Sequence, residues 1–316
     1  MQPFLSVVMP TYNGEKFIAA ALESVREQRE DGVELIIVDD GSSDRTLDIV
    51  REFAKLLPIR LITPGRIGNW VAISNLGLRE ARSDWACFLH QDDFWLPGRI
   101  ARLRAEIEKA EGALILHNAL FVGPNGEDLG PWTCPLQPGG VPPDKFIERL
   151  LIQDFIAMPS PVFHRNAAIR SGGLDEALWF PADWDLWLRL GALGPIRFID
   201  ETLAAFRVHP ASQTAARKVQ PGEWEQQLTT VLTRHLREFG APAKRREGLR
   251  RIATVSIAVN SALSARSRGE SVKLSPVLFK VLALGPLGCY RYLRDSRIVQ
   301  RVRPRLKLRW RSMRKN

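Results

Sequence analysis

The sequence predicts an α/β fold built around a largely parallel sheet, and three segments carry this prediction. Each is an apolar run that ends abruptly at polar or acidic residues, and the runs lie at 5–13, 33–44 and 85–93. Continuous apolar runs are typical of parallel strands that are buried on both faces. The carboxyl ends of such strands meet at one edge, where open α/β sheets bind their ligands. We therefore expect the polar groups that end these runs to share one site.

The other elements follow from hydrophobic periodicity and from turn residues. Apolar residues repeat on one face of 15–28, Pro58 limits the second helix, and Pro97 suits the first turn of another. We expect strands at 5–9, 33–38, 60–63, 85–89, 113–122, 156–164 and 201–207, the last of them at an edge of the sheet. We expect helices at 15–28, 44–56, 71–81, 97–111 and 182–193, a long Gly- and Pro-rich loop at 123–143, and only helices beyond about residue 215.

Composition excludes some classes of protein and divides the chain in two. The three cysteines are widely spaced, which favours a reducing compartment over a disulfide or zinc framework. The first strand begins so early that we expect no signal peptide, and no apolar run reaches the roughly 20 residues that span a bilayer. Residues 241–316 hold 20 Lys/Arg and 3 Asp/Glu, a net +17, whereas residues 1–240 carry a net −7. The basic part predicts an anionic partner, a membrane surface or a nucleic acid.

The ends of the first two strands carry the candidate nucleotide site. Pro10 and the Asn13-Gly14 pair stop the first strand and expose Thr11 and Tyr12 at the sheet edge, where an aromatic ring can stack on a base. An ordinary strand-to-helix turn is the alternative. Asp39 ends the second strand, and a carboxylate there can accept the imide N–H of uracil. The alternative is turn and cap bonding, which we assign to the residues that follow Asp39. Neither a dinucleotide nor a P-loop motif is present.

Asp92 and Asp93 follow the third run, and together they suggest a metal site. Two neighbouring carboxylates at a buried edge repel each other unless a cation or a proton is shared. Mg²⁺ or Mn²⁺ takes oxygen ligands, typically one or two carboxylates together with phosphate oxygens. A diphosphate leaving group requires that charge neutralisation. A solvated acidic turn before the following helix is the alternative interpretation.

The second half of the chain adds a candidate base and a candidate diphosphate contact. Asp183 lies in the first turn of a predicted helix, where it suits either the helix dipole or a general base that accepts a proton from a hydroxyl. Asp185 and Arg189 are four residues apart and predict an ion pair. Arg207 and His209 alternate on a strand, so they point the same way and can meet a diphosphate or a metal. A packed or surface histidine is the alternative.

These segments together resemble the inverting, nucleotide-sugar-dependent glycosyltransferases of family 2, which have the GT-A fold. The resemblance covers roughly residues 4–215. It rests on SVVMPTYNG, IIVDDGSSDRT, NLGLREA, FLHQDDFWLP, GGLDE, ADWDLWLRL and FRVHP, in the order and approximate spacing of the family. It implies a Rossmann-like mixed sheet flanked by helices as the catalytic domain over residues 1–215, with a helical, strongly basic region over residues 216–316.

The resemblance also implies roles for single residues. Pro10, Thr11, Tyr12, Asn13, Asp39, Asn75, Asp92 and Arg207 would bind the nucleotide or the donor. Asp93 and His209 would hold Mn²⁺ or Mg²⁺, and Asp183 would be the catalytic base. The chain departs from the family at His90, where many members have aspartate, at Ala182 in place of glutamate, and at Ile73 in place of a basic residue, so Arg66 is a candidate for the diphosphate contact. These departures bear on donor preference more than on activity.

The basic region completes the predicted function. From Arg291 onward basic residues alternate with Leu, Val and Trp, which favours binding of residues 241–316 at an anionic membrane surface over a disordered solubilising tail. No recognition motif supports nucleic acid. We expect a metal-dependent hexosyltransferase, with a UDP-sugar as donor, that is cytoplasmic or peripheral on the inner face of the plasma membrane. Its acceptor would be a saccharide or lipid-linked saccharide of cell-surface polysaccharide synthesis. The alternative is a catalytically silent nucleotide-sugar-binding regulatory module.

Overall fold

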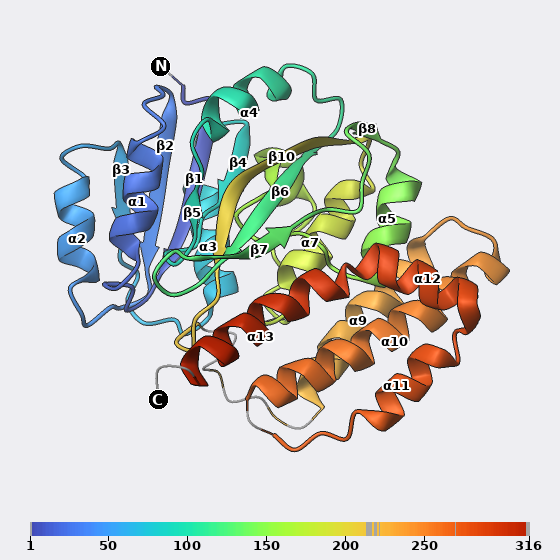
Figure 1. Ribbon diagram of the computed structural model, residues 1–316. Coiled ribbons are helices and arrows are strands. Elements are labelled where there is room, and N and C mark those ends of the chain that lie inside the picture. The colour runs from blue at the N-terminus through green and yellow to red at the C-terminus, as the bar shows by residue number, and fades with distance from the viewer. Residues whose placement is uncertain (1, 213–216, 218–219, 221, 269, 314–316) are drawn as a thin grey trace.

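A mixed sheet runs through the molecule, with helices on both of its faces (Figure 1). The computed structural model describes residues 2–212, 217, 220, 222–268 and 270–313. The strands are β1 (Leu5–Thr11), β2 (Val33–Asp39), β3 (Ile59–Ile62), β4 (Trp85–Phe88), β5 (Phe94–Trp95), β6 (Leu114–Val122), β7 (Asp128–Trp132), β8 (Gly139–Val141), β9 (Val162–His164) and β10 (Ile196–Arg207). Their order is β3-β2-β1-β4-β9-β6-β10-β5, while β7 pairs with β6 and β8 pairs with β10.

The helices of the first two thirds of the chain cover the sheet. They are α1 (Ile18–Arg26), α2 (Thr46–Phe53), α3 (Trp70–Glu80), α4 (Arg99–Ile107), α5 (Pro143–Ile152), α6 (Arg165–Arg170) and α7 (Ala182–Gly191). Alternate residues of each strand point to opposite faces, so Val7 and Met9 pack with α1 while Val8 packs with α3. Both faces of β1 are buried, which explains why the consecutive residues Val7, Val8 and Met9 are all apolar.

The parallel part of the sheet confirms the expectation from the three apolar runs. β3, β2, β1 and β4 are mutually parallel, and Thr11 lies directly beside Asp39 in the register of β1 and β2. The other half of the sheet is mixed, because β9 runs antiparallel to both β4 and β6. The carboxyl ends of β1, β2 and β4 therefore meet at one edge.

Two expectations about the second half are wrong. The strand expected at the edge, β10, lies inside the sheet, parallel to β6 on one side and antiparallel to β5 and β8 on the other. The segment 123–143 is not a plain loop, since it contains β7 and β8. In both cases the strand is fixed by pairing with a distant segment, and the local residue pattern carries no trace of that partner.

The described residues beyond 222 are helical, as expected, and they share a hydrophobic core with the sheet. The helices are α9 (Glu223–Glu238), α10 (Ala243–Ser267), α11 (Ser275–Leu282), α12 (Gly285–Ser296) and α13 (Ile298–Met313). Trp224, Val231 and Leu249 pack in the same buried cluster as Phe163 of β9, while α13 returns to lie along β7 (Figure 1). The predicted boundary between residues 215 and 216 falls outside the described residues and stays a prediction. None of the described helices is long and apolar enough to cross a bilayer.

A single glycine tests the packing of α3 on the sheet. A Cβ at Gly77 would lie 2.5 Å from Cγ1 of Val8 and 3.1 Å from Cγ2 of Val38. We expect Gly77→Ala to lower the free energy of unfolding by about 1–3 kcal/mol, because overpacking outweighs the gain in helix propensity. Urea denaturation measures this change. The matched control is Gly248→Ala in α10, where nothing lies within 4 Å and a gain of up to about 1 kcal/mol is expected.

Candidate functional site

Polar side chains bind the ends of β1 and β2 to each other. The backbone N–H of Asp40 donates to Thr11 O over 2.8 Å, and the backbone N–H of Asn13 donates to Ser42 Oγ over 2.8 Å. Asn13 has a φ of 44°, in the left-handed region, where its short polar side chain is tolerated. Its Oδ1 accepts the backbone N–H of Ser43 at 2.8 Å. The predicted nucleotide site is therefore held in shape by bonds across the two strands.

Both carboxylates that end β2 hold loops in this structure. Asp39 accepts the backbone N–H groups of Gly41 and Ser42 at 3.1 and 2.8 Å, and also the Ser42 hydroxyl. The sequence assigned this turn role to the residues after Asp39, so the structure gives Asp39 a part in the turn as well. Asp40 pairs with Arg66 and accepts the N–H of Gly68 at 3.0 Å. The role of Asp39 toward a nucleoside stays a prediction.

Tyr12 is fixed from two directions. Gln91 holds its backbone, accepting the Tyr12 N–H and donating to Tyr12 O, each over 2.9 Å. The guanidinium of Arg66 lies 3.8 Å from the centre of the Tyr12 ring. A cation over an aromatic face at this distance is attractive. Arg66, the candidate for a diphosphate contact, thus lies beside the residues predicted to bind the nucleoside.

Four of the predicted site residues come together at the end of β4. Nε2 of His209 is paired with Oδ2 of Asp92 at 2.9 Å, and the backbone N–H of Arg207 donates to Oδ1 of Asp93 over 2.9 Å. Arg207 also donates from Nε to the carbonyl of Asp92 over 2.8 Å. Because Arg207 ends β10 and His209 follows it, this cluster joins residues that are more than 110 positions apart in sequence.

The two neighbouring carboxyls have pKa values that move in opposite directions. Burial raises the pKa of Asp93 well above its usual range, and the negative charge of Asp92 raises it further. The pKa of Asp92 is lowered, since its bond to His209 and the nearby histidine charges outweigh its burial. Burial lowers the pKa of His90, the residue in place of an aspartate, although the charge of Asp92 opposes this shift. The surroundings thus favour the charged form of Asp92 over that of Asp93.

The cluster contains two atoms that make no hydrogen bond to the described residues and that could coordinate a divalent metal. Oδ2 of Asp93 and Nδ1 of His209 are buried and have no hydrogen-bond partner among the described residues. Buried polar atoms without partners are rare, and a missing ligand is one reason for them. No group of three or more His, Cys, Asp or Glu side chains in the described part of the chain is arranged to hold an ion. One or two side chains suit Mg²⁺ or Mn²⁺ only if substrate phosphates and water supply the remaining ligands.

Asn75 has a different position from the other predicted donor residues. It is buried in α3, where its side-chain amide donates to Leu174 O and to Oε1 of Glu176, each over 2.9 Å. Its Oδ1 accepts the backbone N–H of Leu174 at 2.9 Å. Asn75 therefore holds the 173–176 segment in place, and the structure does not bring it into the Asp92–His209 cluster.

The candidate base Asp183 lies in the first turn of α7, half-buried and beside a second carboxyl that the sequence analysis missed. Burial raises the pKa of Asp183 to about 6, although the backbone N–H of Trp184, 2.8 Å from Oδ1, opposes the rise. The pKa of Asp154 is raised to about 8, first by burial and then by the charge of Asp183. Asp183 is therefore ionised at neutral pH while Asp154 keeps its proton. The one sequence signal for Asp154 was an isolated acid within the apolar stretch 150–158.

Arg301 of α13 is the other missed residue. Its Nη1 donates to the backbone carbonyl of Asp154 over 2.7 Å, and its charge lowers the pKa of both Asp154 and Asp183. In sequence it was one of many arginines in the basic region, so nothing distinguished it. The return of α13 to β7 is what carries this cation to the candidate base.

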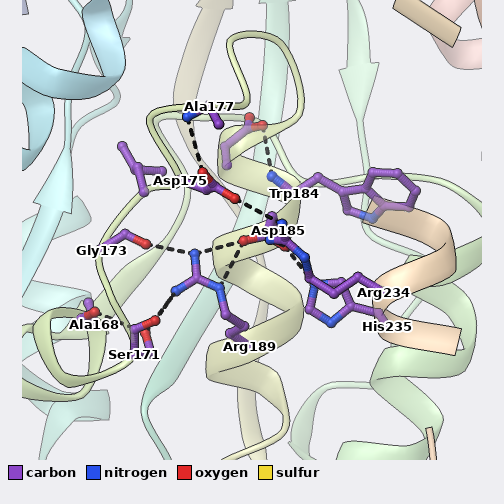
Figure 2. Close-up of polar contacts among 12 residues, drawn as sticks. Ala168, Ser171, Gly173, Asp175, Ala177, Trp184, Asp185, Arg189, Arg234 and His235 are labelled. Atoms are coloured by element: carbon purple, nitrogen blue, oxygen red, sulfur yellow. Dashed lines mark hydrogen bonds and ion pairs between the residues drawn. The ribbon is translucent and has the colours of Figure 1, made fainter. Parts of the chain in front are cut away.

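A buried ion-pair network fixes α7, and Figure 2 shows its contacts. Asp185 is fully buried and accepts bonds from Arg189, Arg234 and His235 at 2.8–2.9 Å. Arg189 also donates to the carbonyls of Ser171 and Gly173, each over 2.6 Å. The predicted Asp185–Arg189 pair is thus present, but it lies in the interior, and it joins α7 to α9 and to the 171–176 turn. Asp183 lies two residues before Asp185 on the same helix, so the network also fixes the position of Asp183.

Comparisons with known proteins agree with this architecture. Residues 6–149 match the family described as glycosyl transferase family 2. An uncharacterized glycosyltransferase of Haemophilus influenzae is 28% identical over 187 residues, which is 59% of this chain and 61% of the relative. One from Rickettsia typhi is 25% identical over 71% of this chain and 70% of its own length. The chain thus spans less than two thirds of the Haemophilus relative.

Solved structures confirm the predicted GT-A type of fold. S. aureus TarS 1–349 in complex with UDP-GlcNAc superposes with a TM-score of 0.69 at 17% identity, covering 93% of this chain and 88% of that one. A mannosyltransferase from Pyrobaculum calidifontis in complex with GDP-Man and Mn²⁺ gives a TM-score of 0.53 at 17% identity, covering 98% and 88%. The predicted resemblance to family 2 and its mixed, helix-flanked sheet are therefore confirmed.

The network around Asp185 supports a stability prediction. We expect Asp185→Asn to lower the free energy of unfolding at pH 7 by about 3 kcal/mol, because it leaves buried cations without their anion. The control Asp48→Asn removes an exposed ion pair with Arg51 and should cost less than about 1 kcal/mol. Urea titrations measure both changes.

The pH dependence gives the same prediction a second readout. The partners of Asp185 outweigh its burial and lower its pKa to about 2, below the roughly 3.9 of an unfolded aspartate. The stability it contributes is present above about pH 4 and is lost as the pH falls toward 2. The difference between wild type and Asp185→Asn should narrow in acid, and a constant difference would contradict the charged role.

Proposed function

We propose that this chain, which is similar to family 2 glycosyltransferases, transfers a sugar from a nucleotide-sugar donor to an acceptor hydroxyl with inversion at the anomeric carbon. The observation that carries this proposal is the pair Asp183 and Asp154, which leaves one ionised carboxylate at the start of α7 at neutral pH. A general base needs a pKa near the working pH and a proton to accept. Asp183 meets the first requirement, and an acceptor hydroxyl supplies the second.

The donor would bind at the carboxyl ends of β1, β2 and β4. Pro10, Thr11, Tyr12, Asn13 and Asp39 are the proposed nucleoside contacts, with Arg66 beside the diphosphate. The fold neighbours have been solved with a uridine and with a guanosine nucleotide sugar. We propose a UDP-sugar, because the Asp39 carboxylate suits the imide N–H of uracil.

Asp93 and His209 are the proposed ligands of Mn²⁺ or Mg²⁺, with Asp92 and Arg207 beside the sugar or diphosphate. The unpartnered oxygen of Asp93 and nitrogen of His209 support this assignment, as does the Mn²⁺ in the mannosyltransferase complex. When bound, the cation would neutralise the charge of the departing nucleoside diphosphate. The raised pKa of Asp93 fits a carboxyl that gains by meeting a positive charge.

The protein's own groups would carry the rest of the reaction. The acceptor oxygen bonds to the anomeric carbon as the bond from that carbon to the diphosphate oxygen breaks. The hydroxyl proton passes to Asp183, whose network through Asp185 and Arg189 holds α7 still. Because Asp154 is neutral, it places no second negative charge beside Asp183. Fixed geometry of this kind lowers the barrier because the reacting groups are already oriented.

The acceptor side is proposed on broader grounds. We propose a saccharide or lipid-linked saccharide of cell-surface polysaccharide synthesis, reached from an anionic membrane surface through residues 241–316, whose net charge is +17. A silent nucleotide-sugar-binding module remains the second candidate, favoured by the His90 and Ala182 departures from the family pattern.

A donor screen separates these candidates. Purified protein is mixed with UDP- and GDP-sugars in the presence of Mn²⁺, Mg²⁺ or a chelator, and released nucleoside diphosphate is measured. We expect release of UDP from one donor, dependent on metal and lost in Asp93→Ala. Metal-dependent binding without release, even with saccharide acceptors, would favour the silent module. Release in chelator that persists in Asp93→Ala would refute the metal assignment.

The pH profile of kcat/KM tests the base. We expect an ascending limb near pH 6, because Asp183 must lose its proton to act. Asp183→Asn should reduce kcat by about 10²–10⁴-fold. Arg301→Gln should move the limb to higher pH, because the positive charge of Arg301 lowers the pKa of Asp183.

Asp154→Asn is the matched control for this profile. An amide resembles the neutral carboxyl that Asp154 keeps up to about pH 8, so the limb should stay near pH 6. Full activity in Asp183→Asn, or an unmoved limb in Arg301→Gln, would overturn the assignment of the base or of its neighbour.

A further inference from the structure

Seven large apolar side chains are exposed on α11 and α12 and on the residue before them. Phe279 is 74% exposed and Leu287 is 86% exposed. We call this set the α11–α12 apolar surface: Leu274, Leu278, Phe279, Leu282, Leu287, Tyr290 and Leu293. Single exposed apolar residues are normal, but a contiguous exposed group marks an interaction site. Within the described chain, the exposed apolar residues of the sheet domain are instead scattered at Leu56, Ile67, Ile169 and Leu193.

The position of α11 fits an outward-facing role. None of its residues is buried, and it packs mainly on its helical neighbours α10 and α12, at the outer side of the helical region (Figure 1). In the stretch from Leu274 to Leu284, Val281 and Leu284 pack partly against the main hydrophobic cluster. The exposed Leu and Phe side chains of α11 contribute little to the core and are available for another contact.

Charge identifies the partner. Lys273 and Lys280 are exposed beside the apolar side chains. Residues 270–313 contain 11 Lys/Arg and 2 Asp/Glu. Leu, Phe and Tyr with flanking lysines match a bilayer surface, where apolar side chains enter the acyl boundary and cations meet anionic headgroups. A second copy of this chain fits less well, because the same excess of positive charge would face itself.

We propose that the α11–α12 apolar surface docks on anionic lipid bilayers, with Phe279 and Leu287 inserted and Lys273 and Lys280 at the headgroups. This moves the anchor away from the basic run that the sequence indicated. In α13 the apolar residues Ile298, Val302 and Leu308 pack on the protein, and Lys307 donates to Leu129 O over 2.9 Å. That helix packs along β7, and among its described residues only Val299 and Leu306 are exposed large apolar side chains, so it presents less apolar surface than α11 and α12.

The inference deepens the proposed function. It rests on that function only for the reason why binding to a bilayer would be useful. A lipid-linked acceptor would be presented at the surface where the protein docks. α13 follows α12 directly and carries Arg301 to Asp154, so the docking helices and the candidate base are joined by one short stretch of chain. Bilayer binding itself requires no catalysis and is measured separately.

Vesicle flotation of the full chain tests the proposal. The probes are phosphatidylcholine vesicles with and without phosphatidylglycerol, at low and high salt. We expect binding to the anionic vesicles that falls with salt. The double variant Phe279→Ser/Leu287→Ser should weaken binding at least about tenfold, since each removes a large buried apolar contact with lipid. Lys273→Gln/Lys280→Gln should weaken it less and reduce the salt dependence.

Matched controls make each outcome decisive. Leu56→Ser/Leu193→Ser removes two leucines elsewhere that are 66% and 58% exposed, and this variant should float like wild type. Equal flotation of wild type and Phe279→Ser/Leu287→Ser, or equal binding to neutral vesicles, would overturn the proposal. So would a dimer by light scattering that the same variant dissociates, since the occupant would then be a second copy.

The failure of this inference is distinguishable from failure of the proposed function. Donor hydrolysis without vesicles should be the same in wild type and in the surface variants, and circular dichroism checks their folding. A protein that floats but never releases nucleoside diphosphate would keep the docking surface and remove the enzyme. A protein that hydrolyses donor but does not float would keep the proposed enzyme and remove the docking surface.

Discussion

The site depends on one buried cation, the guanidinium of Arg207. It is 5% exposed and donates to the carbonyls of Asp92, Gly123 and Pro124, while its backbone N–H donates to Asp93. Three turns that are far apart in sequence are thereby joined where β4, β6 and β10 end. A buried carboxyl such as Asp93 is costly unless a cation or a hydrogen bond compensates for lost hydration. Arg207 supplies both, so it holds the strand ends together and partly offsets the rise that burial and Asp92 cause in the pKa of Asp93.

Asp185 is a second structural anchor, in which a buried anion is surrounded by basic partners. Asp185 has three positively polarised partners, and its pKa falls to about 2, whereas Asp183, two residues earlier, has a pKa raised to about 6 by burial. Neighbouring carboxylates on one helix are thus tuned in opposite directions by their surroundings. The first gives α7 a fixed position, and the second remains able to take up a proton near neutral pH. Structural and candidate catalytic charges are divided between them.

The C-terminal helices contribute both to the hydrophobic core and to the exposed surface. α9 and α10 complete the hydrophobic core of the sheet domain, and α13 brings Arg301 to Asp154. α11 and α12 expose Leu278, Phe279, Leu282, Leu287, Tyr290 and Leu293, while Tyr292 of α12 is buried. The +17 charge of residues 241–316 is therefore not a uniform tail: part of it pairs with Glu148 and Asp295 through Arg245, Arg291 and Arg294, and part remains exposed.

The sequence by itself determined the parallel half of the sheet, the helices that cover it and the ordered motifs of family 2, because buried strands and amphipathic helices leave local apolar patterns. It also named Asp92, Asp93, Arg207 and His209, which the structure brings together. Only the tertiary structure decided that β10 is internal, that 123–143 contains strands, and that Asp154 and Arg301 lie with Asp183. These features depend on pairing between segments far apart in the chain, and such pairing leaves no periodic signal in either segment alone.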